Sequence, residues 1–164
     1  MRVLLTAFNS RFTHSSLALR YLAAACRQAK QEIAVYEPTI QTPLTSVLMD
    51  VYRHKPDIIG IAVHIWNRDL SLALAAAVKQ VMPTVKVIVG GPEVSYAAEQ
   101  TLRENSAIDA VIMGEGDELF PMVVGDLTTT GNFLSRPGLA FRIDGEIVVN
   151  GEPLEVASLD ALPF

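Results

Sequence analysis

The hydrophobic residues of this chain fall in short runs rich in β-branched side chains, and longer runs with helical spacing separate them. Short runs that are apolar on both faces are typical of strands in the middle of a parallel sheet, which helices cover on each side. The predicted strands span residues 2–8, 32–38, 57–65, 85–91 and 109–116. The predicted helices span residues 15–29, 44–55, 70–82, 94–105 and 117–129. This alternation predicts a doubly wound α/β domain with a five-stranded parallel sheet and helices on both faces.

The pattern changes in the last part of the chain. Two strand-like runs within residues 138–151 flank Asp144 and Gly145, a pair typical of two-residue hairpin turns. A polar stretch ending in "ASLDALPF" follows, and we interpret it as a linker. We therefore expect an α/β domain at residues 1–131, then a C-terminal β-hairpin with a linker at residues 132–164.

Composition and charge narrow the class of protein. The chain has 164 residues, which suits one compact domain. Its formal net charge is −5 and its basic residues are scattered, so we expect no nucleic-acid partner. No apolar run approaches the ~20 residues of a membrane helix and no signal peptide is evident, so we expect no membrane partner and a cytoplasmic location. Cys26 is the single cysteine, which excludes an internal disulfide, and its helical setting indicates core packing.

The loops that follow the predicted strands are the candidate ligand site, because open parallel sheets bind ligands at the carboxyl ends of their strands. The G-x-G-x-x-G loop of dinucleotide sites and the G-x-x-x-x-G-K-[ST] loop of nucleoside triphosphate sites are both absent from the sequence. A phosphorylated receiver domain is also excluded, because Asn9 and His64 stand where such a domain needs strand-end aspartates.

Glycines mark the ends of the fourth and fifth predicted strands. Gly90 and Gly91 follow the fourth strand, and Gly114 and Gly116 follow the fifth. Without side chains, these two edges would leave a slot in which a flat ligand can lie against the backbone. Tight turns between strand and helix explain the same glycines equally well. The serines before the first predicted helix likewise suit either a bound phosphate or a helix cap.

Several segments together resemble a known family. They are "NSRFTHSSLALRYL", "PDIIGIAVHIWN", "VIVGGPEVSY", "DAVIMGEGDELF" and the hairpin that leads to "SLDALPF". The combination resembles the N-terminal cobalamin-binding domain of cobalamin-dependent radical S-adenosylmethionine (radical SAM) enzymes, over essentially the whole chain, and "VGGPEVS" and "GEGDE" are its most specific pieces. The resemblance implies a flavodoxin-like (Rossmann-like) fold that holds cobalamin at the carboxyl edge of its sheet. A radical SAM barrel with a C-x-x-x-C-x-x-C cluster motif follows in that family; this chain lacks the motif and stops where the barrel would begin, so we expect a fragment of an enzyme.

The resemblance also implies which residues contact cobalamin. The first loop would lie under the corrin ring, and the ends of the third, fourth and fifth strands would follow the nucleotide tail. The implied residues are Asn9, Ser10, Phe12, Thr13, His14, Ser15, Val63, His64, Ile65, Trp66, Gly90, Gly91, Pro92, Glu93, Gly114, Glu115 and Gly116. A long amphipathic tail needs an apolar slot with small residues and a few polar groups at its rim, and this set agrees with that demand.

His14 is the candidate cobalt ligand. Methionine-synthase-like cobalamin domains carry D-x-H-x-x-G in this loop, where the histidine binds cobalt and the aspartate orients its other ring nitrogen. Here Phe12 and Leu17 stand in place of the aspartate and the glycine. We therefore expect His14 to form a hydrogen bond with the tail or with a helix end rather than to bind cobalt. His64 either faces the slot or is a hydrogen-bonded structural histidine.

The function predicted from these residues is that of a cobalamin-binding module of a radical SAM enzyme, not catalytic by itself. The resemblance implies that the intact enzyme uses cobalamin, S-adenosylmethionine and a [4Fe-4S] cluster for methyl transfer or a radical rearrangement. The implied partners of the module are cobalamin and a C-terminal radical SAM domain. A docking or substrate-recognition domain that binds no cobalamin is the alternative, which the missing D-x-H-x-x-G motif leaves open. A free-standing enzyme is disfavoured, because no nucleophile–base pair or paired catalytic carboxylates stand out.

Overall fold

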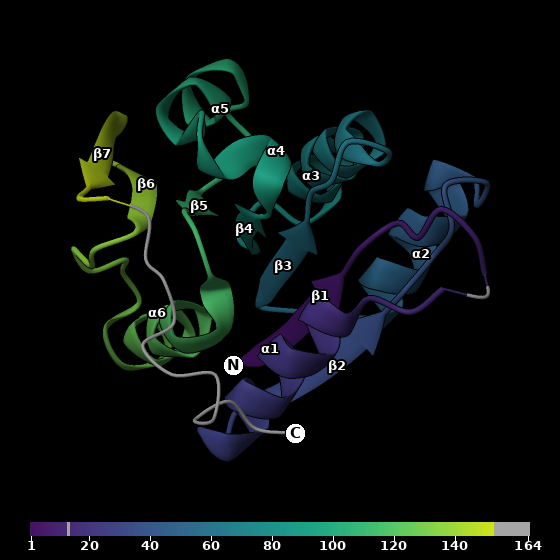
Figure 1. The fold of residues 1–164 in the computed structure, drawn as a ribbon, viewed down its shortest axis with the longest axis horizontal. Helices are drawn as coiled ribbons and strands as arrows, with labels where there is room; N and C mark the ends of the chain where they lie inside the picture. Colours follow the sequence, from purple (N-terminus) through teal and green to yellow (C-terminus); the bar gives the residue numbers. More distant parts are fainter. Residues whose placement is uncertain (13, 153–164) are drawn as a thin grey trace.

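The computed structural model describes residues 1–12 and 14–152, which form one twisted sheet with helices on both faces (Figure 1). Within these residues the sheet has seven strands in the order β2-β1-β3-β4-β5-β6-β7. The strands are β1 (Arg2–Thr6), β2 (Glu32–Tyr36), β3 (Ile58–Ala62), β4 (Lys86–Gly90), β5 (Ala110–Ile112), β6 (Leu139–Ile143) and β7 (Glu146–Asn150). The first five strands pair in parallel, which confirms the predicted five-stranded parallel sheet.

Two hydrophobic cores lie on opposite faces of this sheet. The helices are α1 (Leu17–Gln28), α2 (Leu44–His54), α3 (Arg68–Val81), α4 (Pro92–Ser95), α5 (Ala98–Glu104) and α6 (Gly116–Thr130). Successive side chains of a strand point to opposite faces, so Val3 and Leu5 of β1 pack with α1 and α6, while Leu4 packs with the other helices. Cys26 lies in the core under α1, where burial raises the pKa of its thiol to about 12. No helix among the described residues is long and apolar enough to cross a bilayer.

The predicted C-terminal hairpin is present and extends the sheet. Asp144 and Gly145 connect β6 to β7 with φ angles of +50° and +85°, as a turn with two left-handed residues requires. β6 pairs antiparallel with β5, and β7 pairs antiparallel with β6. The parallel sheet therefore becomes a mixed sheet at this edge, and the hairpin covers the edge of β5.

The prediction of a single helix over residues 94–105 is wrong, because the structure has two helices there. α4 ends at Ser95 and α5 begins at Ala98. The Ser95 hydroxyl donates to the Gly91 carbonyl at 2.9 Å, a bond of the kind that competes with helical backbone bonds and bends a helix. The break turns α5 so that Ala98 and Leu102 reach the core, and it leaves Tyr96 exposed.

Candidate functional site

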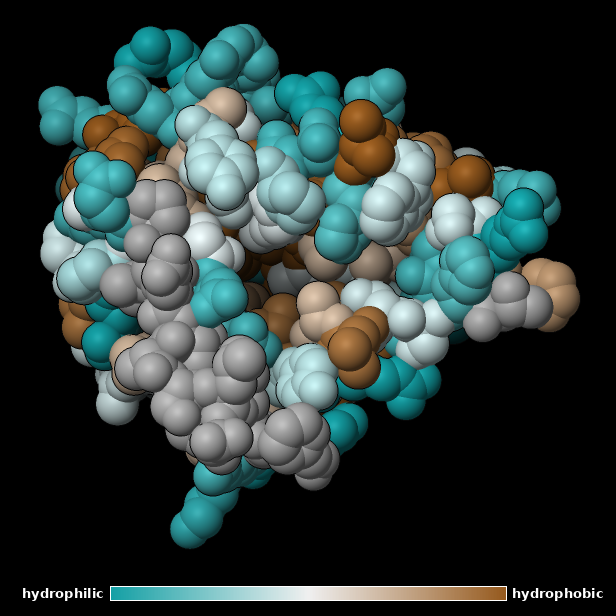
Figure 2. Space-filling view, in the orientation of Figure 1, coloured by the Kyte–Doolittle hydropathy of each residue, from teal (hydrophilic) through white to brown (hydrophobic). Residues whose placement is uncertain are grey.

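A cleft lies at the carboxyl ends of β1, β3, β4 and β5, and it consists of two adjoining cavities. The deeper one, here called the slot, measures about 220 Å³ and lies between the sheet and the two helices α1 and α6. The other, here called the loop cavity, measures about 320 Å³ and lies over the loop between β1 and α1. Ala18 and His64 line both cavities. Figure 2 shows this hollow near the centre of one face, with apolar side chains at its bottom.

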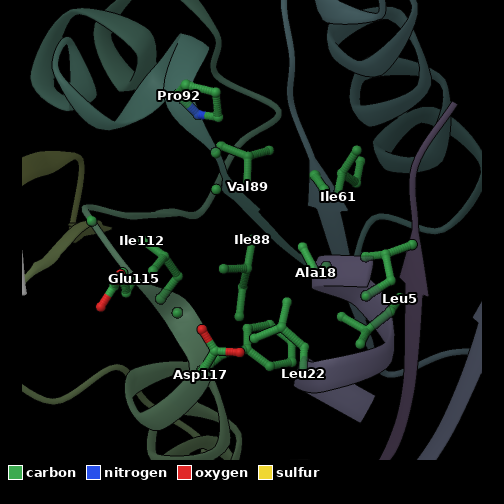
Figure 3. Close-up of a pocket in the computed structure, with 18 of the residues that line it drawn as sticks. Leu5, Ala18, Leu22, Ile61, Ile88, Val89, Pro92, Ile112, Glu115 and Asp117 are labelled. Atoms are coloured by element: carbon green, nitrogen blue, oxygen red, sulfur yellow. The ribbon is translucent and has the colours of Figure 1, made fainter. Parts of the chain in front are cut away.

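Apolar side chains from the sheet and from both helices make up most of the slot. Figure 3 shows Leu22 of α1, Ile88 of β4, Ile112 of β5 and Asp117 of α6 converging on it. Such a surface suits a ligand with a long apolar portion that leaves water when it binds.

Gly60 and Phe120, which the sequence analysis missed, set the inner wall of the slot. Gly60 stands in the middle of β3, and a Cβ atom there would lie 3.0 Å from the Phe120 ring and 2.7 Å from Leu5 Cδ2. Because Gly60 has no side chain, the Phe120 ring of α6 can pack directly against the sheet. A glycine that interrupts a buried strand was the available signal, because it often marks a close approach of another group.

The strand-end glycines divide into two kinds. Gly91 has a φ of +111°, and a Cβ atom there would lie 2.4 Å from the Val63 carbonyl oxygen. The conformation of the turn therefore explains why this position is a glycine. A Cβ atom on Gly90 would lie 3.4 Å from Ile112 Cβ, and one on Gly116 would lie 3.4 Å from Leu22 Cδ2. Gly90 and Gly116 line the slot, so any longer side chain at either position would enter it.

Acidic groups stand at the rim of the slot, at the start of α6. Asp117 lines the slot, and its carboxyl pKa is raised, chiefly by burial and further by the neighbouring carboxylates of Glu115 and Glu118. Glu115 lines the slot as well. These groups supply the polar rim that an amphipathic ligand needs, and Asp117 is a rim residue absent from the predicted set.

His64 and Trp66 form a rigid pair in the loop cavity. Their rings stack with centroids 4.6 Å apart and an angle of 7° between the planes. Trp66 Nε1 donates to the Phe8 carbonyl at 3.2 Å, which ties the pair to the end of β1. Burial lowers the pKa of His64, and the Glu93 carboxylate opposes that effect in part. Burial therefore favours the neutral form of the imidazole where the two cavities meet.

Asn67 holds the loop that carries this pair, although it lines neither cavity. Its side chain is 1% exposed. Its Oδ1 accepts from the His64 backbone N–H at 2.8 Å, while its Nδ2 donates to the carbonyls of Phe8 and Ala62. The residue does occupy the N-cap position of α3, but its side chain makes no capping bond. It instead ties the ends of β1 and β3 together.

His14, in the loop between β1 and α1, also lines the loop cavity. Its Nδ1 is 3.0 Å from the Ser10 hydroxyl, and its backbone carbonyl accepts from Asn9 Nδ2 at 2.8 Å. The Ser10 hydroxyl is thus the partner of this His14 ring nitrogen, whereas the D-x-H-x-x-G motif supplies a carboxylate to orient its histidine. A hydroxyl fixes the direction of the ring but adds no negative charge.

The structure brings most of the predicted site residues together, and it places others elsewhere. Those that line one or both cavities are Asn9, Ser10, His14, Ser15, His64, Trp66, Gly90, Gly91, Pro92, Gly114, Glu115 and Gly116. Val63 is buried in the core on the opposite face of the sheet. Phe12 and Ile65 are exposed and, like Glu93, line neither cavity. Thr13 lies outside the described residues.

This fold and cleft belong to a known class. The chain is a member of the B12-binding domain family, whose pattern it matches over residues 3–124. Membership confirms the predicted Rossmann-like cobalamin-binding fold and makes cobalamin the cofactor of the family to which the chain belongs.

Curated relatives of this chain include methyltransferases. An uncharacterised methyltransferase of Pyrococcus horikoshii, PH0819, is 26% identical over 160 residues, which cover 93% of this chain and 35% of that protein. The cobalamin-dependent radical SAM methyltransferase TokK of Streptomyces tokunonensis is 27% identical over 96 residues, or 58% of this chain and 14% of TokK. The chain thus spans about a third or less of the length of these relatives.

Solved structures agree on the fold. The radical S-adenosylmethionine methyltransferase TsrM from Kitasatospora setae, with cobalamin and a [4Fe-4S] cluster bound, has a TM-score of 0.79 at 15% identity, over 99% of this chain and 31% of TsrM. The cobalamin-dependent radical enzyme OxsB, with aqua-cobalamin and S-adenosylmethionine bound, has a TM-score of 0.78 at 15% identity, over 94% of this chain and 22% of OxsB. At this level of identity the similarity establishes the fold.

Proposed function

We propose that this chain is the cobalamin-binding module of a radical SAM methyltransferase and is not catalytic by itself. The observation that carries the proposal is the slot, which is apolar along the sheet, acidic at its rim and kept open by Gly90 and Gly116. These features fit the nucleotide tail of cobalamin, which is long and amphipathic. When bound, cobalamin supplies a cobalt centre able to carry a methyl group.

The two cavities would divide the work of binding. The slot would hold the tail between the sheet and the helices α1 and α6, away from water. The loop cavity would support the macrocycle on the His64–Trp66 pair and on the loop that contains Ser10 and His14. The protein in this scheme binds, orients and shields the cofactor, which carries the chemistry.

The remaining components of the reaction would come from a radical SAM domain, the partner that the relatives suggest. S-adenosylmethionine and a [4Fe-4S] cluster are the additional cofactors of the proposed enzyme. Cys26 is the single cysteine of this sequence and is buried, so the cluster ligands would belong to that partner domain. The cytoplasmic location and the absence of a nucleic-acid partner stay predictions from composition.

The proposal is tested by retention of the cofactor. Purified protein is mixed with hydroxocobalamin and desalted, and the visible spectrum is recorded. We expect corrin absorbance at about one equivalent, and none for Gly116→Leu, whose side chain would fill the slot. Gly125→Ala, in the same helix but away from both cavities, is the matched control and should retain cobalamin. Loss of all corrin from the unaltered protein would contradict the proposal and favour a docking domain without cofactor.

The same preparation tests the cobalt ligand. We infer that His14 contacts the cofactor without binding cobalt, because its orienting partner is the Ser10 hydroxyl and not a carboxylate. His14→Ala should therefore leave the visible spectrum of bound cobalamin unchanged. A changed cobalt spectrum would instead make His14 the axial ligand.

A further inference from the structure

A carboxylate outside both cavities holds the loop that forms the floor of the loop cavity. We propose that Glu37, the residue directly after β2, is a positioning residue for cobalamin binding because it holds Asn9, Ser15 and Ser16 at the two ends of the loop between β1 and α1. This inference rests on the proposed function, since it concerns the same cofactor. Glu37 lines neither cavity, so it would act through the residues that it binds.

Three donors of the loop converge on the two oxygens of Glu37. Oε2 accepts from Asn9 Nδ2 at 2.7 Å and from the Ser16 backbone N–H at 2.8 Å. Oε1 is 3.3 Å from the Ser15 hydroxyl, which donates to it. One side chain thus connects the first residue of the loop to its last two, and charge-assisted bonds of this kind are stronger than neutral ones.

Backbone hydrogen bonds also join Asn9, at the beginning of the loop, to the segment directly after Glu37. Asn9 N–H donates to the Pro38 carbonyl at 2.8 Å, and the Ile40 N–H donates to the Asn9 carbonyl at 2.9 Å. Asn9 is buried, so these bonds are shielded from competing water. The loop is therefore fastened at both ends to the segment that follows β2.

Glu37 also completes the N-terminus of α1. The first turn of α1 contains no acidic residue, and its N-cap Ser16 accepts from the Leu19 N–H at 3.4 Å. A carboxylate at this end of a helix is favourable, and here it comes from a different part of the chain. The helix terminus is therefore matched by Glu37 within the protein, so the phosphate role that the sequence left open for the serines is not expected.

Asn9 connects Glu37 to His14 in the loop cavity. Its Nδ2 donates both to Glu37 and to the His14 carbonyl at 2.8 Å, so the carboxylate and the histidine share one amide group. On the other side, the Ser15 hydroxyl accepts from Arg20 Nε at 2.6 Å. Residues that orient contact groups in this way change cofactor affinity without touching the cofactor.

The test compares cobalamin affinity in Glu37→Gln and in the unaltered protein. Gln removes the negative charge that strengthens these bonds, and only one of its two amide atoms can accept a hydrogen bond, so we expect the Kd for hydroxocobalamin to rise about tenfold. Glu32→Gln is the matched control, because Glu32 is exposed at the opposite end of the same strand. Binding is followed by spectral titration well below the melting temperature of each variant.

The outcomes separate the two proposals. If the unaltered protein binds no cobalamin, the proposed function fails. If it binds and Glu37→Gln binds equally well, even with a lower Tm, Glu37 has a structural role and this inference is overturned. Should Glu37→Gln fail to fold, Asn9→Ala removes the shared amide while leaving the Glu37–Ser16 bond, and an unchanged Kd in that variant would overturn the inference. A tenfold rise in Kd in Glu37→Gln, with Glu32→Gln unchanged, supports it.

Discussion

Burial favours the neutral form of His64, and this gives the stability of the fold a pH dependence. Burial lowers its pKa below the ordinary 6.5. The unfolded chain then binds this proton more readily than the folded protein does. Protonation of His64 therefore leaves the free energy of unfolding unchanged above pH 6.5 and lowers it as the pH falls below 6.5. Relative to His64→Gln, the unaltered protein should lose about 1–2 °C of Tm between pH 7.5 and 5.5. Parallel melting curves for the two proteins would contradict this.

The Asp117 carboxyl gives stability the opposite pH dependence. Its carboxyl pKa lies above the ordinary 3.8, so the folded protein binds this proton more tightly than the unfolded chain does. At neutral pH the group is charged in both states, and its partial burial lowers stability; the loss disappears as the pH falls through the raised pKa. Asp117→Asn should therefore raise Tm by about 1–2 °C at pH 7, measured by thermal melting. A gain that persists unchanged at pH 4 would show that charge is not its cause.

The predicted site residues that line the cavities in the structure include several whose position follows from their neighbours in the chain. Gly90 and Gly116 were found because they follow strands, and His64 because it ends one. Asn67 and Glu37 act through partners far away in sequence, and nothing near them in the chain indicates those contacts. Phe12 and Ile65 were included in the predicted site because they lie in the same loops as His14 and His64. In the structure, both side chains are exposed to solvent.

Elements were predicted on the same basis. Strands buried on both faces and helices with one apolar face each have a local period, so all five parallel strands were found. The Asp144–Gly145 pair specified the hairpin but not its partner, because the pairing of β6 with β5 joins segments that are distant in the chain. The break between α4 and α5 depends on the Ser95 hydroxyl reaching backbone carbonyls of Gly91 and Ile112, which sequence periodicity does not report.

An ion pair joins α6 to the segment that leads into β6. The Arg136 guanidinium binds both carboxylate oxygens of Asp126, with Nη2 2.7 Å from Oδ1. The Asp126 side chain is 11% exposed, so its removal would leave the Arg136 charge poorly paired. Asp126→Ala should lower the free energy of unfolding by about 2 kcal/mol in urea denaturation.

The control for that experiment is an exposed pair. Glu99 and Arg103 stand one turn apart on α5, with side chains 56% and 70% exposed. Glu99→Ala should cost less than about 0.5 kcal/mol, since exposed pairs contribute little. Equal losses in the two variants would mean that the Asp126–Arg136 pair does not hold the hairpin segment in place.

At the scale of the whole molecule, large exposed apolar side chains gather in the segments that follow β1, β3 and β4. They are Phe12, Leu17, Ile65, Trp66 and Tyr96. Leu17 and Trp66 line the loop cavity, while the other three line neither cavity. Exposed apolar groups gathered near a cleft are typical of surfaces that bind something. Under the proposed function, we therefore expect this edge of the sheet to divide into a part that binds the cofactor and a part that contacts the radical SAM domain.

Hydroxyl-radical footprinting tests that division, because it reports the accessibility of each aromatic and aliphatic side chain. Addition of hydroxocobalamin should slow the oxidation of Leu17 and Trp66 severalfold, since the macrocycle would cover the loop cavity. Oxidation of Phe12, Ile65 and Tyr96 should not change, because these side chains line neither cavity and would be covered by a partner domain instead. If cobalamin protects Phe12 and Ile65 as well, this division is wrong, and both residues belong to the cofactor contacts that the resemblance implied.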